Sequence, residues 1–340
     1  MIKYYIEKIA ERENLTLQDA YNVMHKIMSG EVHEAQIAAL VLALKTKGET
    51  PEEVAGFAKA MRDFSVKINH QDKNMIDVCG TGGDGSNTFN ISTAVSFVVA
   101  GVGIKVAKHG NRSISSKSGS ADVLAELGLN INLSPSQSEQ ALTEIGIAFL
   151  FAPNFHPAMK YAAPVRKALG IKTIFNVLGP LTNPAGTKKQ LIGVYNLSTA
   201  QLMAEAVKYL DMEKVYFVNT SNSFDEISLT GETNVIEYSL DNGIKNFRID
   251  QDSFGYAKIN IEKIQSESVL NNSKIMLSVL KDKIKDEAYY VVAANAALAL
   301  RVAGNSDDLI ACKDAAEDSI LSGKAFEKLN ALKNFGEKFQ

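Results

Sequence analysis

The residues best suited to chemistry fall into three clusters, and the first is a glycine-rich stretch that suits an anion. Residues 79–93 read CGTGGDGSNTFNIST, so four glycines stand among small polar side chains. Backbone N–H groups without a neighbouring Cβ can approach a phosphate closely. Asn90 or Ser92 could cap a helix that follows, and the N-terminus of that helix would attract an anion. Each residue alone would fit a flexible turn, but together they predict a cradle for a phosphate-bearing ligand.

The same stretch contains the G-x-G-x-x-G spacing of a dinucleotide-binding loop, at Gly80, Gly82 and Gly85. That loop must open a helix at once, and an acidic side chain for the ribose follows about 20 residues later. Here residues 86–90 (SNTFN) are poor helix starters, and residues 108–110 (KHG) stand where the acid belongs. A Walker A loop is excluded because no Lys-Ser or Lys-Thr pair follows the glycines. The sequence therefore favours a longer anion cradle over both nucleotide motifs.

The second cluster is basic and rich in serine. Residues 108–122 read KHGNRSISSKSGSAD and follow a predicted strand. The carboxyl ends of parallel strands meet at one edge of a sheet, so this cluster should lie beside the glycine stretch. Two such loops suit a ligand with phosphates at both ends. We assign Lys108 to function and Lys117 to the solvated surface, while His109 fits a core position and the site equally well.

The third cluster is the acidic pair Asp225-Glu226, which stands just before a predicted strand. Adjacent carboxylates can hold Mg²⁺ through their oxygens and bound waters. Most such pairs are solvated surface, but Mg²⁺ commonly accompanies diphosphates. Beside two phosphate cradles, the pair predicts a magnesium site.

The elements that must position these clusters are helical up to about residue 66. Thr50, Pro51 and Glu53 form a capping-box start, and Gly30 and Gly48 are helix stops. Residues 37–44 are apolar on nearly every side, which predicts a covering partner from this chain or from another copy.

From Met75 onward, short apolar runs alternate with helical segments, which is typical of a mostly parallel sheet. Strands are predicted at 75–79, 104–107, 147–151, 191–195 and 215–218, and helices near 92–102, 119–127, 136–145 and 198–210. Residues 240–244 (LDNGI) predict a hairpin turn, and residues 287–335 are Ala-rich and helical. The predicted fold class is α/β, with a small all-helical N-terminal domain and a larger α/β domain around a mostly parallel central sheet.

The domain boundaries follow from this change from helices alone to alternating strands and helices. Residues 1–70 form the predicted helical domain, and the helical segment 157–185 is expected to pack onto it. Residues 71–156 and 186–340 form the predicted α/β domain, which should bind the phosphate-bearing ligand.

Composition narrows the class of protein. The 340 residues carry 36 Lys and Arg against 39 Asp and Glu, which gives a net charge of -3. This balance argues against a protein that binds nucleic acid through its overall electrostatic field. Two cysteines are too few for a disulfide framework or a cysteine-based zinc site. The start has no signal-peptide core, and the longest apolar run, 94–104, is shorter than the roughly 20 residues of a membrane span. We expect a cytoplasmic protein without membrane partners.

Taken together, these clusters resemble the anthranilate phosphoribosyltransferases of tryptophan biosynthesis over almost the full length. The resemblance rests on residues 79–93, on 106–128 (VAKHGNRSISSKSGSADVLAELG), on 151–186 (FAPNFHPAMKYAAPVRKALGIKTIFNVLGPLTNPAG) and on 224–235 (FDEISLTGETNV). It implies a Mg²⁺-dependent glycosyltransferase (pentosyltransferase) that joins the 5-phosphoribosyl group of 5-phosphoribosyl 1-diphosphate (PRPP) to the amine of anthranilate. It also implies a homodimer through the helical domains, with the active site between the two domains.

The resemblance also implies roles for individual residues. Those expected around PRPP are Gly80, Gly83, Asp84, Thr88, Asn90, Ile91, Ser92, Thr93, Lys108, His109, Gly110, Asn111, Arg112, Ser113, Ser115, Ser116 and Ser120. Those expected to contact anthranilate are Gly80, Asn111 and Arg166, and those expected at the metal are Ser92, Asp225 and Glu226. No functional role is predicted for residues 246–272.

Two other functions stay open at the sequence level. One is a pyrimidine nucleoside phosphorylase of the same superfamily, which would need no anchor for a carboxylate. The other is a non-catalytic, nucleic-acid-binding relative, which would need a basic groove. No dedicated catalytic base is predicted, because an aromatic amine already carries its lone pair.

Overall fold

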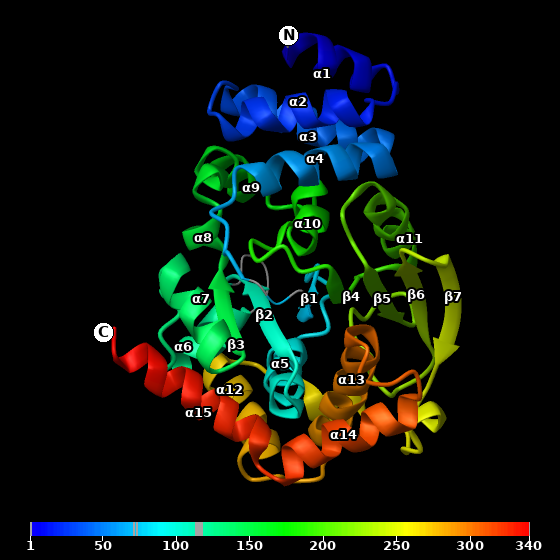
Figure 1. Ribbon diagram of the computed structural model, residues 1–340. Helices are drawn as coiled ribbons and strands as arrows, with labels where there is room; N and C mark the ends of the chain where they lie inside the picture. The colour runs from blue at the N-terminus through cyan, green and yellow to red at the C-terminus, as the bar shows by residue number, and fades with distance from the viewer. Residues whose placement is uncertain (1, 71, 73, 113–117, 340) are drawn as a thin grey trace.

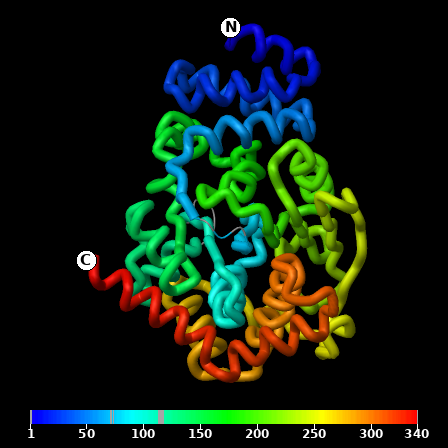
Figure 2. Tube along the Cα trace, in the orientation of Figure 1, coloured from blue at the N-terminus to red at the C-terminus, as the bar shows by residue number. Residues whose placement is uncertain are grey.

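A computed structural model describes residues 2–70, 72, 74–112 and 118–339 (Figure 1). A helical layer built by the N-terminus stands over a central sheet, and the C-terminal helices cover the far side of that sheet (Figures 1 and 2). None of the helices in these ranges combines the length and the apolarity that a bilayer crossing requires.

The N-terminal layer consists of α1 (Ile2–Ala10), α2 (Leu17–Met28), α3 (Glu34–Lys47) and α4 (Pro51–Asp63). The predicted capping box is confirmed, because Thr50 Oγ1 accepts from the Glu53 N–H and Glu53 Oε2 accepts from the Thr50 N–H. Glu53 is buried, and its other oxygen accepts from the Leu15 N–H at 2.9 Å. This one carboxylate therefore ties the start of α4 to the segment before α2.

Seven strands form one sheet within the described residues, in the order β3-β2-β1-β4-β5-β6-β7. The strands are β1 (Met75–Gly80), β2 (Lys105–Gly110), β3 (Ile147–Phe151), β4 (Lys189–Gly193), β5 (Lys214–Thr220), β6 (Thr233–Ser239) and β7 (Gly243–Ile249). The first five are parallel, and β6 and β7 are antiparallel. The mostly parallel sheet and the hairpin at 240–244 are thus confirmed.

Two apolar cores flank this sheet. One lies between the sheet and α5 (Ile91–Val102), α12 (Val269–Leu280), α13 (Glu287–Ala303), α14 (Leu309–Leu321) and α15 (Lys324–Glu337). The other runs without a break from α1–α4 to α11 (Leu197–Ala206) and the opposite face of β4–β6. The helical layer is therefore joined to the sheet through packed side chains.

The remaining helices are short. On the sheet side are α6 (Ser120–Glu126) and α7 (Pro135–Glu144), and η3 (Val207–Tyr209) follows α11. The segment after β3 contains α8 (Ala152–Phe155), η1 (Pro157–Tyr161), α9 (Ala163–Leu169), α10 (Ile174–Leu178) and η2 (Pro180–Thr182). This segment packs on the helical layer, with α9 against α3 and α10 against α4. After β7 come η4 (Asp252–Phe254) and η5 (Ile261–Ile264).

One local prediction is wrong. Asp225 and Glu226 do not stand just before a strand, because β6 begins only at Thr233. The residues that follow the pair make isolated contacts to the end of β5 instead, such as the Ser228 N–H to Thr220 Oγ1 at 3.4 Å. The acidic pair therefore sits in the loop that follows β5, at the carboxyl end of a parallel strand.

Candidate active site

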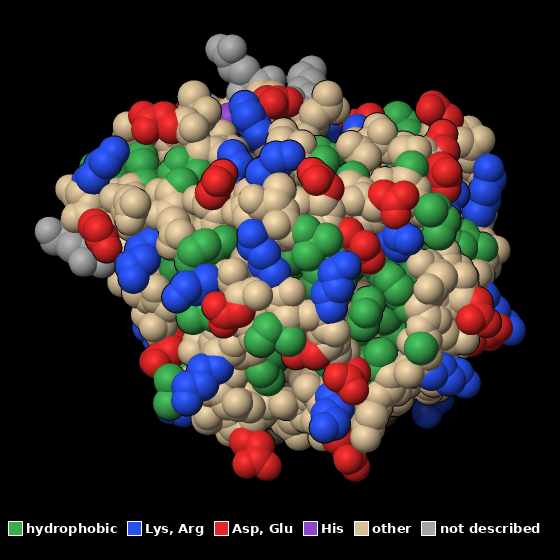
Figure 3. Space-filling model, turned by 90° about the horizontal axis from the view of Figure 1, so that it is seen from below, with side chains coloured by type: hydrophobic (Ala, Val, Ile, Leu, Met, Phe, Trp, Pro, Cys, Tyr) green, Lys and Arg blue, Asp and Glu red, His purple; other side chains and the backbone are tan. Residues whose placement is uncertain are grey.

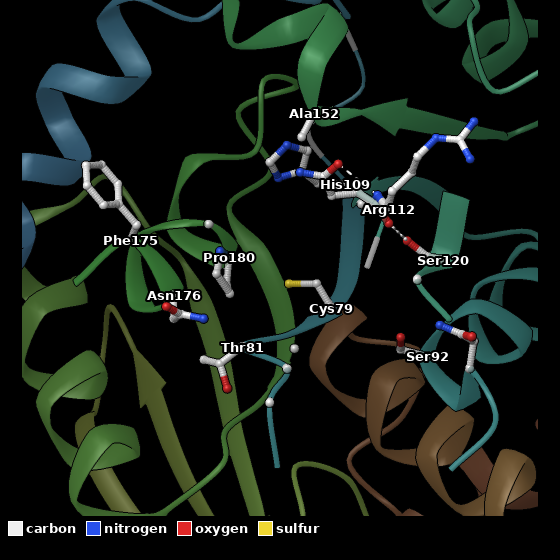
Figure 4. A pocket seen from close by; sticks show the side chains of 18 of the residues that line it. Cys79, Thr81, Ser92, His109, Arg112, Ser120, Ala152, Phe175, Asn176 and Pro180 are labelled. Carbon is white, nitrogen blue, oxygen red and sulfur yellow. Dashed lines mark hydrogen bonds between the residues drawn. The ribbon is translucent and has the colours of Figure 1, made fainter. Parts of the chain in front are cut away.

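A cavity of about 940 Å³ lies where the carboxyl ends of β1 and β2 face the helical side of the molecule. Loops after β1, β2 and β5 line it from the sheet, and Met61 of α4 and Arg166 of α9 line it from the other side. Figure 4 shows Cys79, Thr81 and Ser92 on one side of this space, and Phe175, Asn176 and Pro180 on another. Strands β2 and β4 lie on either side of β1, so the order of the strands reverses direction at β1. Open α/β sheets bind ligands at such a point.

The glycine stretch forms a ten-residue loop between β1 and α5, as a long anion cradle requires. Gly82, Gly83 and Gly85 all have φ between +64° and +79°, a left-handed conformation that a side chain disfavours. The base of the loop is held by the Thr81 N–H, which donates to Gly193 O at 2.9 Å. Gly82 and Gly85 have open space where a Cβ would stand, so these two glycines supply backbone conformation rather than room for packing.

The acidic pair closes against this loop. The Gly82 N–H donates to Asp225 Oδ2 at 3.1 Å, and the Ser92 N–H donates to Glu226 Oε1 at 3.1 Å. A Cβ on Gly193 would lie 1.6 Å from the Asp225 carbonyl oxygen. Asn295 of α13 braces the next residue, accepting from the Ile227 N–H at 3.1 Å and donating to Ile227 O at 2.8 Å.

These carboxylates are placed where ionisation is unfavourable without a cation. Desolvation, followed by the charge of Asp84, raises the pKa of Asp225 to about 8. Desolvation, followed by the charges of Asp225 and Asp84, raises the pKa of Glu226 well above its usual range. A divalent cation would stabilise both ionised forms, so these residues fit Mg²⁺.

The donor set suits a metal that arrives with its ligand. Within the described residues, no three His, Cys, Asp or Glu side chains form a ready-made metal cluster. Mg²⁺ usually takes one or two carboxylates and completes its shell with waters and substrate phosphates. Asp225 and Glu226 provide that number of hard oxygen ligands beside the glycine loop.

Lys108 forms part of the cavity lining, although it is almost completely buried. Its Nζ donates to Val78 O at 2.7 Å and lies 3.4 Å from Ser92 Oγ. Desolvation lowers the pKa of Lys108, and the carboxylates of Asp77 and Glu226 oppose that effect. The buried Asp77 in turn accepts from the His109 N–H at 3.2 Å and from Asn183 Nδ2 at 2.8 Å. A buried charge network thus fixes the ends of β1 and β2.

His109 is buried and also lines the cavity, so it meets both descriptions that the sequence left open. Its ring lies 5.1 Å from the ring of His156, between centroids. Burial, followed by the charge of His156, lowers the pKa of His109 to about 3. Burial likewise lowers the pKa of His156 to about 4. Both imidazoles are therefore neutral at pH 7.

Arg166 reaches the cavity from α9, on the side opposite the glycine loop. Its guanidinium lies 5.4 Å from the centroid of the Phe175 ring. Desolvation lowers its pKa, and within the described residues it forms no salt bridge, so a positive charge faces the cavity without a carboxylate. Such a group can bind an anionic ligand.

The second cluster is described only in part. Ser120 Oγ donates to Asn111 O at 3.3 Å (Figure 4), and Arg112 Nη1 pairs with Asp122 Oδ1 at 2.8 Å. The predicted site residues Ser113, Ser115 and Ser116, and the surface residue Lys117, lie outside the described residues.

Most of the predicted site residues meet at the cavity. Those that line it are Gly80, Gly83, Asp84, Thr88, Asn90, Ser92, Lys108, His109, Gly110, Asn111, Arg112, Ser120, Arg166, Asp225 and Glu226. Two do not: Ile91 and Thr93 are completely buried in the first turn of α5, behind the lining.

The predicted helix cap is wrong. Asn90 occupies the N-cap position of α5, but its side chain makes no capping hydrogen bond, and Ser92 lies inside the helix. The reason is a competing partner, because Asn90 Oδ1 accepts from Nδ2 of the distant Asn272 at 2.7 Å.

Several lining residues were not predicted from the sequence, among them Met61, His156, Asn176 and Ser266. His156 and Asn176 lie in the family-like stretch 151–186, which offered a signal. Met61 and Ser266 carried none, because only the packing of α4 and of the segment before α12 brings them to the cavity.

Comparison with known proteins identifies the family of the chain. Residues 3–65 match the helical bundle domain of a glycosyl transferase family, and residues 72–326 match the a/b domain of a glycosyl transferase family. The anthranilate phosphoribosyltransferase of Geobacillus stearothermophilus is 45% identical over 98% of each chain.

Solved structures agree as well. The crystal structure of anthranilate phosphoribosyltransferase from Thermus thermophilus has a TM-score of 0.91 at 36% identity, covering 98% of this chain and 99% of that one. The enzyme from Saccharomyces cerevisiae, solved in complex with PRPP and Mg, has a TM-score of 0.91 at 28% identity and covers 99% of this chain and 98% of that one. With both domains matched and near-complete coverage at this identity, the chain belongs to the anthranilate phosphoribosyltransferase family.

Proposed function

We propose that the protein transfers the 5-phosphoribosyl group from PRPP to the amine of anthranilate, giving N-(5-phosphoribosyl)anthranilate and diphosphate. One observation carries this function: a backbone anion cradle with an acidic pair faces Arg166 across a single cavity, and Arg166 has no salt-bridge partner among the described residues. The cradle suits the phosphates of PRPP, and Arg166 suits the carboxylate of anthranilate.

We assign the roles of the residues from the family resemblance, and their places in the cavity lining support the assignment. The glycine loop, Asn90, Lys108 and the end of β2 at His109–Arg112 surround PRPP, with Ser120 at the start of α6. Gly80, Asn111 and Arg166 contact anthranilate. The planar guanidinium of Arg166 can form two parallel hydrogen bonds to a carboxylate.

Asp225, Glu226 and Ser92 would hold Mg²⁺, which when bound supplies positive charge against the departing diphosphate. Backbone N–H groups of the glycine loop donate to the same developing charge. Lys108 adds a fixed positive charge below the loop. Cleavage of the bond at the anomeric carbon gives the bonding electrons to the diphosphate and leaves positive charge on the ribose. These groups would therefore act together on the negative charge of the leaving group.

No residue of the chain needs to remove a proton before attack. The aromatic amine is neutral and carries its lone pair, so the task of the protein is to place it against the anomeric carbon. His109 is neutral at pH 7 because of its lowered pKa, so it cannot donate a proton as an imidazolium. Catalysis in this reading rests on positioning and on electrostatic stabilisation.

We also propose the organisation in which this site works. Residues 1–70, with 157–185 packed onto them, form one domain, and 71–156 with 186–340 form the other. Two copies associate through the helical domains, since the outer face of α3 presents Ala35, Ala39 and Leu42 to solvent. The enzyme acts in the cytoplasm, without nucleic-acid or membrane partners.

The direct test is the loss of anthranilate fluorescence in the presence of PRPP and Mg²⁺. We expect turnover that requires all three components, and none with thymidine or uridine plus phosphate. Phosphorolysis of either nucleoside without anthranilate turnover would support the nucleoside phosphorylase instead. A salt-sensitive shift of DNA in a gel would support the nucleic-acid-binding alternative.

A further inference from the structure

A segment with no predicted function lies against the glycine loop. The Phe89 N–H donates to Ile264 O at 2.9 Å, and the Ser266 N–H donates to Asn87 O at 2.7 Å. Gln265 Nε2 donates to Ser86 O at 2.9 Å, and Thr88 and Gln265 form an isolated antiparallel bridge. Residues 264–266 thus pair with 86–89 through this isolated bridge, just before α12 begins at Val269.

The first turn of α12 brings Asn272 to the end of the same loop. Asn272 is only 1% exposed, although its side chain is polar. Its Oδ1 accepts from the Asn90 N–H at 3.0 Å, and its Nδ2 donates to Asn90 Oδ1 at 2.7 Å. Its Nδ2 also lies 3.4 Å from Ser118 Oγ. One buried amide therefore holds both the backbone and the side chain of Asn90.

The chemistry of these bonds fixes which way both amides face. A backbone N–H can only donate, so the atom of Asn272 beside the Asn90 N–H must be its oxygen. The amino group of Asn272 must then face Asn90, and Asn90 must offer its oxygen in return. Ser118 Oγ, at 3.4 Å from Asn90 Oδ1, is placed to donate to the same oxygen. The amino group of Asn90 is left to point elsewhere, and within the described residues it has no hydrogen-bond acceptor.

We propose that Asn272 is a positioning residue that locks the side chain of Asn90 with its amino group turned to the cavity, as a donor to an anionic oxygen of the phosphoribosyl substrate. The inference rests on the proposed function and adds to it a residue outside the cavity lining. An amide can present either an acceptor or a donor, and only the donor suits a phosphate. Without Asn272, Asn90 can rotate its oxygen toward the ligand.

The test compares Asn272→Ala with Asn271→Ala in the full-length protein. Asn271 is the same residue type one position earlier, and its side chain is exposed, which makes it a matched control. We expect Asn272→Ala to raise the KM for PRPP about ten-fold, since hydrogen bonds to charged groups commonly account for a factor of this size. The KM for anthranilate should change far less. Asn271→Ala should match the wild type in both.

A second pair of variants separates orientation from simple loss of packing. Asn272→Asp keeps the size of the side chain and the bond from the Asn90 N–H, but it offers an oxygen where the amino group stood. Asn90 must then turn its amino group to that oxygen and its own oxygen to the cavity. We expect a larger loss of PRPP binding by titration calorimetry than for Asn272→Ala. Asn271→Asp adds the same charge at an exposed position and should lose little.

The outcomes distinguish this inference from the proposed function. Equal constants for Asn272→Ala and Asn271→Ala, in an enzyme whose wild type turns over anthranilate, would overturn the role of Asn272. Equal losses in Asn272→Asp and Asn271→Asp would overturn it too, because charge alone would then explain them. Adding Asn272→Ala to Asn90→Ala should cause a much smaller loss than Asn272→Ala alone, since only the bond to the backbone N–H of residue 90 is then removed. Fully additive losses would contradict action through the Asn90 side chain. A folded wild type that does not consume anthranilate would instead refute the proposed function.

Discussion

At the scale of single residues, buried and half-buried charged side chains meet around the cavity. Lys108 is buried under the cradle, Asp225 and Glu226 face it, and Arg166 stands opposite. Low local dielectric strengthens each interaction and also makes an unpaired charge costly. In the proposed function, PRPP, anthranilate and Mg²⁺ would neutralise these charges, so the site would favour them as ligands.

Arg166 provides the sharpest test of anthranilate binding. Arg166→Ala should raise the KM for anthranilate about ten-fold or more, because a charge-assisted hydrogen bond contributes roughly 1.5–3 kcal/mol. The KM for PRPP should move much less. Arg166→Lys should restore binding only in part, because an ammonium cannot form the parallel pair of bonds. Steady-state kinetics checks all three, and equal weakening of both substrates would mean that Arg166 holds the two sides of the cavity together.

The acidic pair tests the metal site. Replacing Asp225 by Asn and Glu226 by Gln removes charge and keeps shape. We expect a large loss of turnover, a higher Mg²⁺ requirement and an unchanged circular dichroism spectrum. Activity measured against Mg²⁺ concentration checks this, and an unaltered Mg²⁺ dependence in the double variant would count against these ligands.

The two buried histidines predict a loss of stability in acid. Their folded-state pKa values, about 3 for His109 and about 4 for His156, lie below the ordinary value of about 6.5. The unfolded chain therefore takes up protons first as pH falls. The free energy of unfolding is at its full value above about pH 6.5 and decreases below that pH. Each histidine lowers the free energy of unfolding by about 1.4 kcal/mol per pH unit in that window. Urea unfolding at pH 7, 6 and 5 should show a shallower decline for His156→Gln, and parallel declines would contradict the assignment.

At the scale of elements, the loops are shaped by glycines with two different tasks. Gly82 has φ +64° and open space around its missing Cβ, so it supplies conformation. Gly193 of β4 has no such φ, but the Asp225 carbonyl lies where its Cβ would be. The first glycine lets the backbone turn, and the second lets the acidic loop lie directly on the sheet.

This difference predicts an order of effects. Gly82→Ala should weaken PRPP binding moderately, because a left-handed conformation costs a side chain about 1–2 kcal/mol. Gly193→Ala should abolish most turnover, since the backbone of the Asp225 loop must move. Gly255→Ala is the control for backbone strain alone, because Gly255 has φ +70° in open space and does not line the cavity. Thermal unfolding and kinetics on the three variants check the order, and a Gly193→Ala enzyme with normal Mg²⁺ dependence would contradict it.

At the scale of the whole molecule, the cavity exists only because two parts of the chain face each other. The helical layer carries Met61 and, through α9, Arg166 to one side, and the sheet carries the phosphate loops to the other. On the face formed by the C-terminal helices, acidic and basic side chains are interspersed (Figure 3). The charged groups with a proposed role lie instead at the cavity.

The proposed dimer has its own test on α3. Leu42 is 47% exposed on the outer face of this helix, beside Ala39 and Thr46. Leu42→Glu should convert the dimer to a monomer, because burying an unpaired carboxylate in an apolar contact is unfavourable. Sedimentation velocity checks the change, with Leu321→Glu as a control, since Leu321 is similarly exposed (38%) on the distant α14. A wild-type monomer would refute the proposal outright.

The sequence by itself determined the elements and the three clusters. Strand and helix positions follow from local periodicity, and the capping box at Thr50 is a bond between neighbours in the chain. The glycine loop could be told from a Rossmann loop by the residues that follow it. These features are local, so their signals lie within a few residues of one another.

The tertiary structure decided how the clusters are held. The Gly82 N–H finds Asp225 at a separation of 143 residues, and Asn90 finds Asn272 at a separation of 182. The expected helix cap at Asn90 failed for this reason, because a buried partner on α12 took the oxygen that a local rule assigned to α5. A polar group's local options are visible in the sequence, but which option prevails depends on the groups that packing places beside it, since burial removes the water that would otherwise satisfy them.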